Sequence, residues 1–283
     1  MKILVFGGKG YMGQEFLRLF PNAVAPSADI ADCNAVAAVL DTQKPDVVIN
    51  AAGKTGRPNI DWCEDHKEET VHANITGPLI LLNECQKRGI YWVHLGSGCV
   101  YQGDNGGKGF SEEDAPNFRG SFYSLTKAAC DEILREFPAG PDGKGGVLIL
   151  RLRMPFDGSL HERNLISKLT KYSRVLDTEN SLTYLPDFFA AAKVLIERRK
   201  TGIYHVVNPG VMSPYRIMEL YKELVDPRHT FERLTLGELS EVAKAGRSNC
   251  VLTNAKLLSE GIKMRPVETV VREAFSAIAG LKP

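Results

Sequence analysis

The chain has 283 residues, enough for one large α/β unit or two modest domains, and its hydrophobic (43%) and charged (24%) fractions are ordinary for a globular enzyme. The formal net charge of +1 gives no electrostatic reason to expect nucleic acid or an anionic membrane as a partner. No apolar run approaches the roughly 18 residues that a membrane span needs, and the chain opens on an apolar run without a leader, so we expect a cytoplasmic protein. None of the six cysteines forms a Cys-x-x-Cys pair, which predicts reduced thiols and no metal site.

Short apolar runs alternate with amphipathic segments through the first two-thirds of the chain. The runs are rich in β-branched and aromatic residues and do not alternate in polarity, which is typical of strands buried on both faces of a parallel sheet. The alternation with helical patterns predicts an α/β fold with a doubly wound parallel sheet. The expected strands are Ile3–Phe6, Ala23–Ala25, Val47–Ile49, Trp92–Leu95 and Val147–Leu150, and the expected helices are Met12–Phe20, Ala35–Leu40, Glu69–Arg88 and Tyr123–Phe137.

The last part of the chain differs from the rest. From about Asn208 there are two helical stretches, Tyr215–Leu224 and Leu236–Ala245, and little strand signal. This pattern predicts a smaller C-terminal substrate lobe that closes over the sheet. Two glycine-rich segments, Gln102–Gly109 and Pro138–Gly146, are expected to be surface loops. We expect a dinucleotide-binding domain of residues 1–152 and about 175–207, and a substrate lobe of residues 153–174 and 208–283.

A glycine motif follows the first expected strand directly and opens a helix. Its glycines, Gly7, Gly10 and Gly13, are spaced one residue more widely than the usual dinucleotide fingerprint. Gly7 permits a tight turn, Gly10 lets backbone approach a pyrophosphate, and Gly13 lets helix and strand pack closely. The helix N-terminus then offers free N–H groups to the phosphates. The cofactor-binding residues expected here and at the neighbouring strand ends are Gly7, Gly10, Tyr11, Met12, Gly13, Ser27, Asp29, Ile30, Ala51, Ala52 and Gly53.

The second expected strand bears on the choice of cofactor. An NADH site usually carries an acid at the end of that strand, where it bonds the ribose 2′-hydroxyl. Pro26 and Ser27 stand there instead, with neither an acid nor an arginine, so we expect NADPH with NADH tolerated. The carboxylate of Asp29 has two readings, as an acceptor for the adenine amino group or as part of the helix N-cap region that includes Asp32.

A phenol and an ammonium stand four residues apart at Tyr123 and Lys127, which places them on one face of a helix. A lysine held beside the phenol is expected to lower the pKa of the phenol, so that Tyr123 can donate and accept a proton. Ser97, at the end of a buried strand, offers a hydroxyl that can bind the substrate carbonyl oxygen to which Tyr123 would donate its proton. The three residues therefore predict a carbonyl reductase site.

Together with the glycine motif, this constellation resembles the extended short-chain dehydrogenase/reductases, whose core is a Rossmann fold. Five longer strings are also distinctive: Thr55–Glu64, Gly120–Ser124, Arg151–Pro155, Asn208–Val211 and Arg247–Asn249. They resemble the nucleotide-rhamnose synthase epimerase/reductases, including the C-terminal half of plant rhamnose synthases. The resemblance implies a UDP- or dTDP-4-keto-6-deoxy-glucose substrate, 3,5-epimerisation followed by 4-reduction to the L-rhamnose nucleotide, and a homodimer.

The resemblance implies an acid and a base for epimerisation. Cys99 lies two residues past Ser97, so both side chains can project from one side of an extended segment. A thiolate there is a usable base if a nearby cation stabilises it, and GDP-fucose synthase resembles this segment and uses a cysteine. Lys168 resembles the lysine of the rhamnose enzymes and is the expected acid, with His161 and His94 as alternatives. A buried structural cysteine and a solvated helix lysine are the competing readings.

Further residues are expected to hold the ligands. Lys127 should also bond the nicotinamide ribose, and Asn74 either supports a water relay to Lys127 or is a polar residue of helix packing. Arg57 and Arg247 suit the diphosphate because arginine binds phosphate through two hydrogen bonds, although each could be a surface arginine. The remaining expected substrate contacts are Thr55, Asn59 and Asn164.

Two rival functions stay open at this point. One is a dTDP-4-dehydrorhamnose reductase without epimerase activity, in which Cys99 and Lys168 are structural. The other is a non-catalytic, cofactor-binding regulatory subunit. The second rival is disfavoured because Ser97, Tyr123 and Lys127 are all present.

Overall fold

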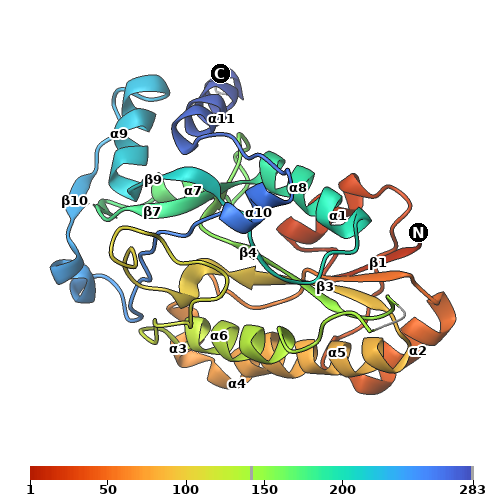
Figure 1. Cartoon of the computed structure of the whole chain (residues 1–283). Coiled ribbons are helices and arrows are strands. Elements are labelled where there is room, and N and C mark those ends of the chain that lie inside the picture. The colour runs from red at the N-terminus through yellow and green to blue at the C-terminus, as the bar shows by residue number, and fades with distance from the viewer. Residues whose placement is uncertain (141–142, 282–283) are drawn as a thin grey trace.

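The computed structural model describes residues 1–140 and 143–281. Five parallel strands form the central sheet, in the order β1-β2-β3-β4-β8 (Figure 1). The first four of these strands coincide with predicted apolar runs, whereas β8 was not predicted from the sequence. The predicted α/β fold is confirmed. Their bounds are β1 Ile3–Phe6, β2 Val47–Asn50, β3 Tyr91–Ser97, β4 Val147–Leu152 and β8 Gly202–His205.

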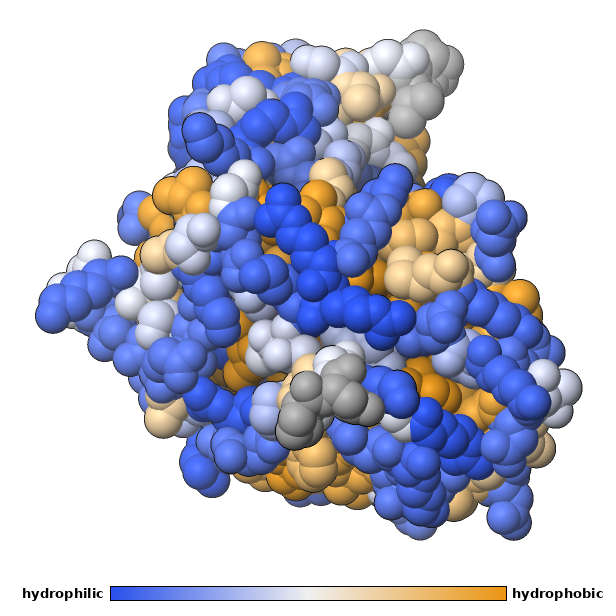
Figure 2. Space-filling model, turned by 45° about the vertical axis from the view of Figure 1, so that its right-hand side comes forward, coloured by the Kyte–Doolittle hydropathy of each residue, from blue (hydrophilic) through white to orange (hydrophobic). Residues whose placement is uncertain are grey.

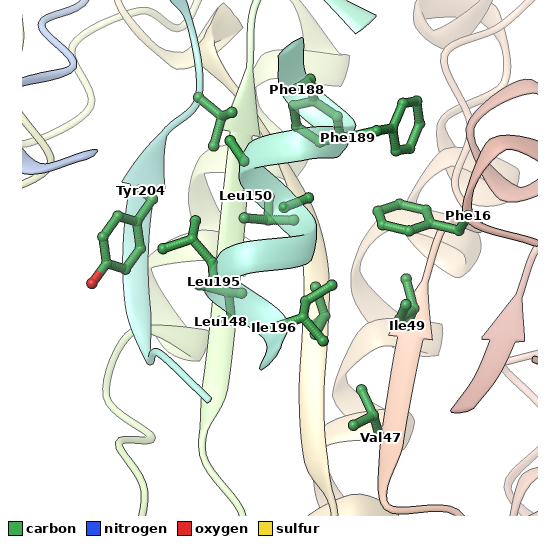
Figure 3. Close-up of a cluster of buried hydrophobic side chains, with 14 of the residues drawn as sticks. Phe16, Val47, Ile49, Leu148, Leu150, Phe188, Phe189, Leu195, Ile196 and Tyr204 are labelled. Carbon is green, nitrogen blue, oxygen red and sulfur yellow. The ribbon is translucent and has the colours of Figure 1, made fainter. Parts of the chain in front are cut away.

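Helices cover both faces of this sheet, as doubly wound topology requires. Successive residues of a strand point to opposite faces, so Ile3 and Val5 pack with α1 (Tyr11–Leu19) and α8 (Leu185–Glu197). Figure 3 shows this side of the core, where the rings of Phe16 and Phe189 meet edge to face with centroids 5.0 Å apart. Leu4 and Phe6 pack on the other side, against α2 (Cys33–Gln43), α5 (Gly77–Lys87) and α6 (Phe122–Leu134).

The segment expected as one helix over Glu69–Arg88 is interrupted. After the short α3 (Trp62–Asp65) come α4 (Lys67–Val71), a π-helical turn over His72–Thr76, and α5. Pro78 has no N–H to donate to the carbonyl four residues earlier, so the regular ladder cannot run through this point. Asn74 is a buried residue of this π-helical turn. Such turns are frequent at functional sites.

A smaller lobe stands above the central sheet in Figure 1. Its own core includes Phe156, Leu182, Met212, Ile217 and Phe275. Figure 2 shows apolar surface in the recess where this upper lobe joins the body of the molecule. The lobe contains a three-stranded sheet (β5 Pro155–Phe156, β7 Asn180–Tyr184, β9 Asn208–Met212) and a strand pair (β6 Arg174–Leu176, β10 Glu232–Leu234). Its helices are α7 Leu165–Leu169, α9 Pro214–Leu224 and α11 Val267–Leu281. The short helix α10 Ala255–Ser259 lies instead beside β8 of the central sheet.

Several predicted elements differ from the structure. The expected strand Ala23–Ala25 is reduced to one bridge between Val24 and Leu4. The expected helix Leu236–Ala245 is a 3₁₀ helix over Leu236–Glu241, and the helix that carries Lys168 is only the short α7. The expectation of little strand structure after Asn208 is wrong, because β9 and β10 form there. Asn, Pro and Gly in β9 are poor strand formers, and pairing with β7 imposes the extended conformation.

Two further expectations concern boundaries. Gln102–Gly109 is a loop of turns and bridges, whereas Pro141 and Asp142 of the second expected loop lie outside the described residues. Val175 and Leu182 pack in the core of the small lobe rather than against the central sheet. We therefore propose that the chain returns to the dinucleotide-binding domain near Tyr184, later than the sequence suggested.

Among the helices that the structure describes, none has the length and apolar character needed to cross a bilayer.

Candidate active site

The glycine motif forms the turn between β1 and α1 beside the end of β2. Gly7 has a φ of +79°, and a Cβ on it would come within 2.4 Å of the Ala52 backbone nitrogen. A Cβ on Gly13 would come within 2.2 Å of the Gly7 carbonyl oxygen. Both positions therefore require glycine, for the turn and for close packing respectively. Adjacent to this turn is a hollow of about 560 Å³.

This hollow joins several of the residues expected to bind the cofactor. Gly7, Asp29, Ile30, Ala52 and Gly53 line it, together with Ala28, Lys54, Glu68, Glu69, His72 and Ala73. Asp32 is the N-cap of α2, where its Oδ1 accepts from the Ala35 N–H at 3.0 Å. Asp29 is therefore not the N-cap, and its Oδ1 accepts from the Ala31 N–H at 2.9 Å. Its position in the hollow favours the reading as a ligand-facing carboxylate.

Two other residues expected at the cofactor have side chains engaged elsewhere. The Tyr11 hydroxyl donates to Asp157, and its ring stacks on His161 with centroids 4.2 Å apart. Asn74 accepts from the Lys54 N–H at 2.8 Å, and donates to the Lys54 carbonyl at 2.9 Å and to Thr126 Oγ1 at 3.3 Å. Asn74 thus joins the loop after β2 to α6, next to Lys127. The water relay stays a prediction.

The reductase constellation lies where β3 ends against the start of α6. The Ser97 hydroxyl accepts from the Cys99 N–H at 3.2 Å and is hydrogen-bonded to the Tyr123 phenol. Ser121 caps α6 by accepting from the Ser124 N–H at 3.1 Å. This cap fixes the helix start that carries Tyr123. Lys127 follows one turn later, with its Nζ 2.8 Å from both the Leu95 carbonyl and His94 Nε2.

The electrostatics of Tyr123 differ from the expectation. Burial raises the pKa of Tyr123 well above its usual value, the nearby Cys99 raises it further, and the hydrogen bond with Ser97 lowers it. The expected lowering by Lys127 is wrong in this arrangement, because Lys127 is held by His94 and Leu95 and burial dominates at the phenol. Burial and Lys127 also hold the pKa of His94 well below its usual value. No pattern in the sequence indicates this contact between Lys127 and His94.

A second cavity, of about 380 Å³, opens beside this constellation towards the small lobe. It brings together five residues expected in the site: Thr55, Asn59, Cys99, Lys168 and Arg247. Lys168 is partly buried in α7, and burial together with the positive charge of Arg163 lowers the pKa of its ammonium. A lysine with a lowered pKa can give up a proton more readily near neutral pH.

The expected diphosphate and sugar contacts are engaged within the protein. Arg247 makes a two-pronged ion pair with Asp61, at 2.8 and 2.9 Å. Burial opposes the negative charge of Asp61, but the hydrogen bonds from Arg247 and from the Ala245 N–H, together with the charge of Arg247, outweigh it and the pKa of Asp61 is lowered. Arg57 lies in a neighbouring hollow, largely exposed and 3.3 Å from Glu162. Asn164 is buried, caps α7 and donates to the Asp157 carboxylate at 2.8 Å.

Arg153 was missed in the sequence, although it lines the same cavity. Its Nη1 donates to the Cys99 thiol at 2.8 Å. The available signal was an arginine at the carboxyl end of a buried strand, two residues after Arg151. A charged residue in that position needs a partner, and the sequence did not show that the partner is Cys99.

A dinucleotide turn, a parallel sheet and a Ser-Tyr-Lys constellation define a short-chain dehydrogenase/reductase, a class of NAD(P)-dependent reductases. A family model described as the RmlD substrate binding domain matches residues 1–279, and the chain belongs to this family.

Relatives and solved structures agree with this assignment. The chain is 37% identical over 283 residues to a bifunctional dTDP-4-dehydrorhamnose 3,5-epimerase/dTDP-4-dehydrorhamnose reductase of Arabidopsis thaliana, covering 96% of this chain and 92% of the relative. It is 36% identical to a trifunctional UDP-glucose 4,6-dehydratase/UDP-4-keto-6-deoxy-D-glucose 3,5-epimerase/UDP-4-keto-L-rhamnose-reductase of the same plant, covering 97% of this chain and only 42% of that relative.

The fold matches solved structures over nearly the whole chain. The L780 UDP-rhamnose synthase of Acanthamoeba polyphaga mimivirus superimposes with a TM-score of 0.91 at 32% identity, covering 98% of this chain and 99% of the other. A dTDP-4-dehydrorhamnose reductase of Bacillus anthracis in complex with NADP gives a TM-score of 0.81 at 19% identity, covering 99% of both chains, which shows the shared fold. The resemblance to epimerase/reductases that the sequence suggested is confirmed.

Proposed function

We propose that this protein is a bifunctional 3,5-epimerase/4-reductase that converts UDP- or dTDP-4-keto-6-deoxy-D-glucose to the corresponding L-rhamnose nucleotide. The observation that carries the proposal is that Cys99 and Lys168 line one cavity, while the backbone N–H of Cys99 donates to the hydroxyl of Ser97 in the reductase constellation. The similarity to the Arabidopsis epimerase/reductase supports the same substrate class. A reductase without epimerase activity would not need a thiol and an amine at this cavity.

The turn and the hollow beside it fit a nicotinamide dinucleotide. The lack of a Cβ at Gly7 and Gly13 lets the backbone of the turn pack closely, and the hollow beside it extends from Gly7 to Asp29 and Ile30. Gly7, Gly10 and Gly13 would hold the pyrophosphate end, and Asp29 would accept from the adenine amino group. When bound, the nicotinamide supplies a hydride for C4 of the sugar.

Epimerisation requires proton transfer at C3 and C5, whose protons are acidified by the C4 ketone. Cys99, as a thiolate, would remove each proton and leave an enolate. Lys168 would return a proton to the opposite face, which inverts the carbon centre. The lowered pKa of Lys168 suits it to donate this proton and recover it from solvent.

Reduction then uses the residues at the end of β3. Ser97 would donate a hydrogen bond to the C4 oxygen and orient it, and Tyr123 would transfer its proton to that oxygen. The phenol of Tyr123, whose pKa is raised by burial, carries its proton at neutral pH and can donate it. Lys127, held by Leu95 and His94, would position the nicotinamide ribose.

Product analysis tests this function directly. The protein is incubated with UDP- or dTDP-4-keto-6-deoxy-glucose and NADPH in D₂O, and the product is identified by NMR. We expect an L-rhamnose nucleotide with deuterium at C3 and C5. Reduction without deuterium at these carbons would identify a reductase without epimerase activity. Turnover of neither the ketone nor the cofactor would favour the regulatory alternative.

The cofactor preference is expected to be modest, with NADPH favoured over NADH by about tenfold or less in kcat/KM. Pro26 and Ser27 stand where an acid would repel the 2′-phosphate of NADPH and an arginine would bind it. Because neither residue type is present, the site neither excludes nor strongly selects the 2′-phosphate. A tenfold ratio corresponds to only about 1.4 kcal/mol, less than a charge-assisted pair of hydrogen bonds provides. Steady-state kinetics with both cofactors measure the ratio. A strong preference for NADH would mean that Asp29 or its neighbours bind the ribose hydroxyls.

A further inference from the structure

Arg153 is a buried arginine whose bonding partners include no carboxylate among the residues that the structure describes. Its side chain is 5% exposed. Besides Cys99, its guanidinium donates to Asn180 Oδ1 and to the Ser248 carbonyl. A guanidinium stays charged in proteins, and a buried charge is costly unless it is paired. Arg153 therefore stands in a site that favours an additional negative charge.

Arg151, two residues earlier in β4, provides the contrast. It is also buried, but its guanidinium is paired with the Asp131 carboxylate at 3.2 Å. Arg153 has neutral amide and carbonyl oxygens in place of that carboxylate. Of the side chains bonded to its guanidinium in the described chain, only the Cys99 thiol can become an anion. The ion pair that Arg151 already has would form at Arg153 only when Cys99 loses its proton.

We propose that Arg153 is the counter-ion that holds Cys99 as a thiolate and thereby positions it as the epimerisation base, an inference that rests on the proposed function. The sulfur lone pair takes the proton from C3 or C5 and forms an S–H bond. The electron pair of the broken C–H bond passes into the enolate, whose charge lies on the C4 oxygen. Protonation from the opposite face, where Lys168 lines the cavity, consumes the enolate.

The groups around Cys99 come from several elements. Arg153 lies just past β4, Tyr123 comes from α6, Cys250 lies close enough to interact electrostatically, and Lys168 lines the same cavity from α7. Burial raises the pKa of Cys250, so this second thiol stays neutral and does not compete for Arg153. The nearby Cys99 also raises the pKa of Tyr123. Arg153 itself transfers no proton.

The test measures the thiolate without any substrate. Iodoacetamide alkylates thiolates, and peptide mass spectrometry gives the alkylation rate of Cys99 separately from the other cysteines at each pH. Arg153→Met is expected to lower the Cys99 rate at pH 7 by about tenfold or more and to move the pH profile upward, because removal of a neighbouring cation disfavours the thiolate. Arg153→Lys, which keeps the charge but not the planar guanidinium that also donates to Asn180 and Ser248, should recover part of the rate.

Arg151→Lys is the matched control, since Arg151 is equally buried and makes no bond to Cys99. Its Cys99 alkylation profile should equal that of the wild type. An unchanged profile in Arg153→Met would overturn the proposal. If Arg153→Met does not fold, a lower rate in Arg153→Lys than in Arg151→Lys supports the proposal, and equal rates overturn it.

The same proteins separate this inference from the proposed function. Solvent deuterium at C3 and C5 should fall in Arg153→Met in parallel with alkylation, while reduction of the epimerised ketone falls much less. A lowered alkylation rate in the variant, with no deuterium incorporation by the wild type, would overturn the epimerase function and retain the Arg153–Cys99 ion pair. Normal deuterium incorporation in Arg153→Met would overturn the role of Arg153 and retain the function.

Discussion

Tyr123→Phe is expected to lower the rate of ketone reduction by about 10²–10⁴-fold, the usual contribution of a positioned proton donor. The phenylalanine ring retains the packing of the buried tyrosine but has no proton for the C4 oxygen. Ser97 still orients that oxygen and Lys127 keeps its bonds to Leu95 and His94, so cofactor binding should change little. Single-turnover oxidation of NADPH measures the chemical step, and fluorescence titration measures cofactor affinity.

Tyr204→Phe is the control for removal of a buried phenol. Tyr204 is 3% exposed on β8 and its hydroxyl donates to Glu260 at 3.0 Å, outside both cavities. This variant should reduce the ketone at nearly the wild-type rate. If Tyr123→Phe did the same, Tyr123 would not be the proton donor. If its affinity for NADPH fell as far as its rate, Tyr123 would be needed for cofactor binding rather than for chemistry.

Local patterns in the sequence were sufficient to predict the strands β1 to β4 of the central sheet and the cofactor turn, but not β8. Buried parallel strands need continuous apolar runs, and a turn that brings α1 against the end of β2 needs glycine at Gly7 and Gly13. The Tyr123–Lys127 pair lies on one helix and is therefore visible from spacing alone. All of these features depend on residues close together in the chain.

The features that the sequence did not predict depend on distant contacts. Arg153 and Cys99 are 54 residues apart, and Arg247 and Asp61 are 186 residues apart, so no local pattern joins them. β9 forms by pairing with β7 despite its unfavourable residues. The electrostatic state of Tyr123 depends on burial, which spacing does not reveal, and for this reason the expected effect of Lys127 on its pKa was wrong.

Cys99→Ser is expected to stop incorporation of solvent deuterium at C3 and C5 while sparing reduction. A hydroxyl is far less acidic than a thiol, so serine cannot supply the required anionic base even beside Arg153. The replacement is nearly isosteric and can still accept a hydrogen bond from the Arg153 guanidinium. Ser97, Tyr123 and Lys127 should therefore keep their positions, and a 4-keto-rhamnose nucleotide that is already epimerised should still be reduced.

The separation of the two activities identifies the base, because loss of a merely buried thiol would depress both activities together or neither. Cys250→Ser supplies the comparison, since Cys250 is a buried thiol that donates to the Gly98 carbonyl and does not line the cavity. NMR of the 4-keto-6-deoxy-glucose nucleotide in D₂O should show deuterium exchange with Cys250→Ser and none with Cys99→Ser. Undiminished exchange with Cys99→Ser would leave Cys99 as a packing residue. The base would then have to be sought among the other titratable groups of the cavity, with Lys168 the first to test.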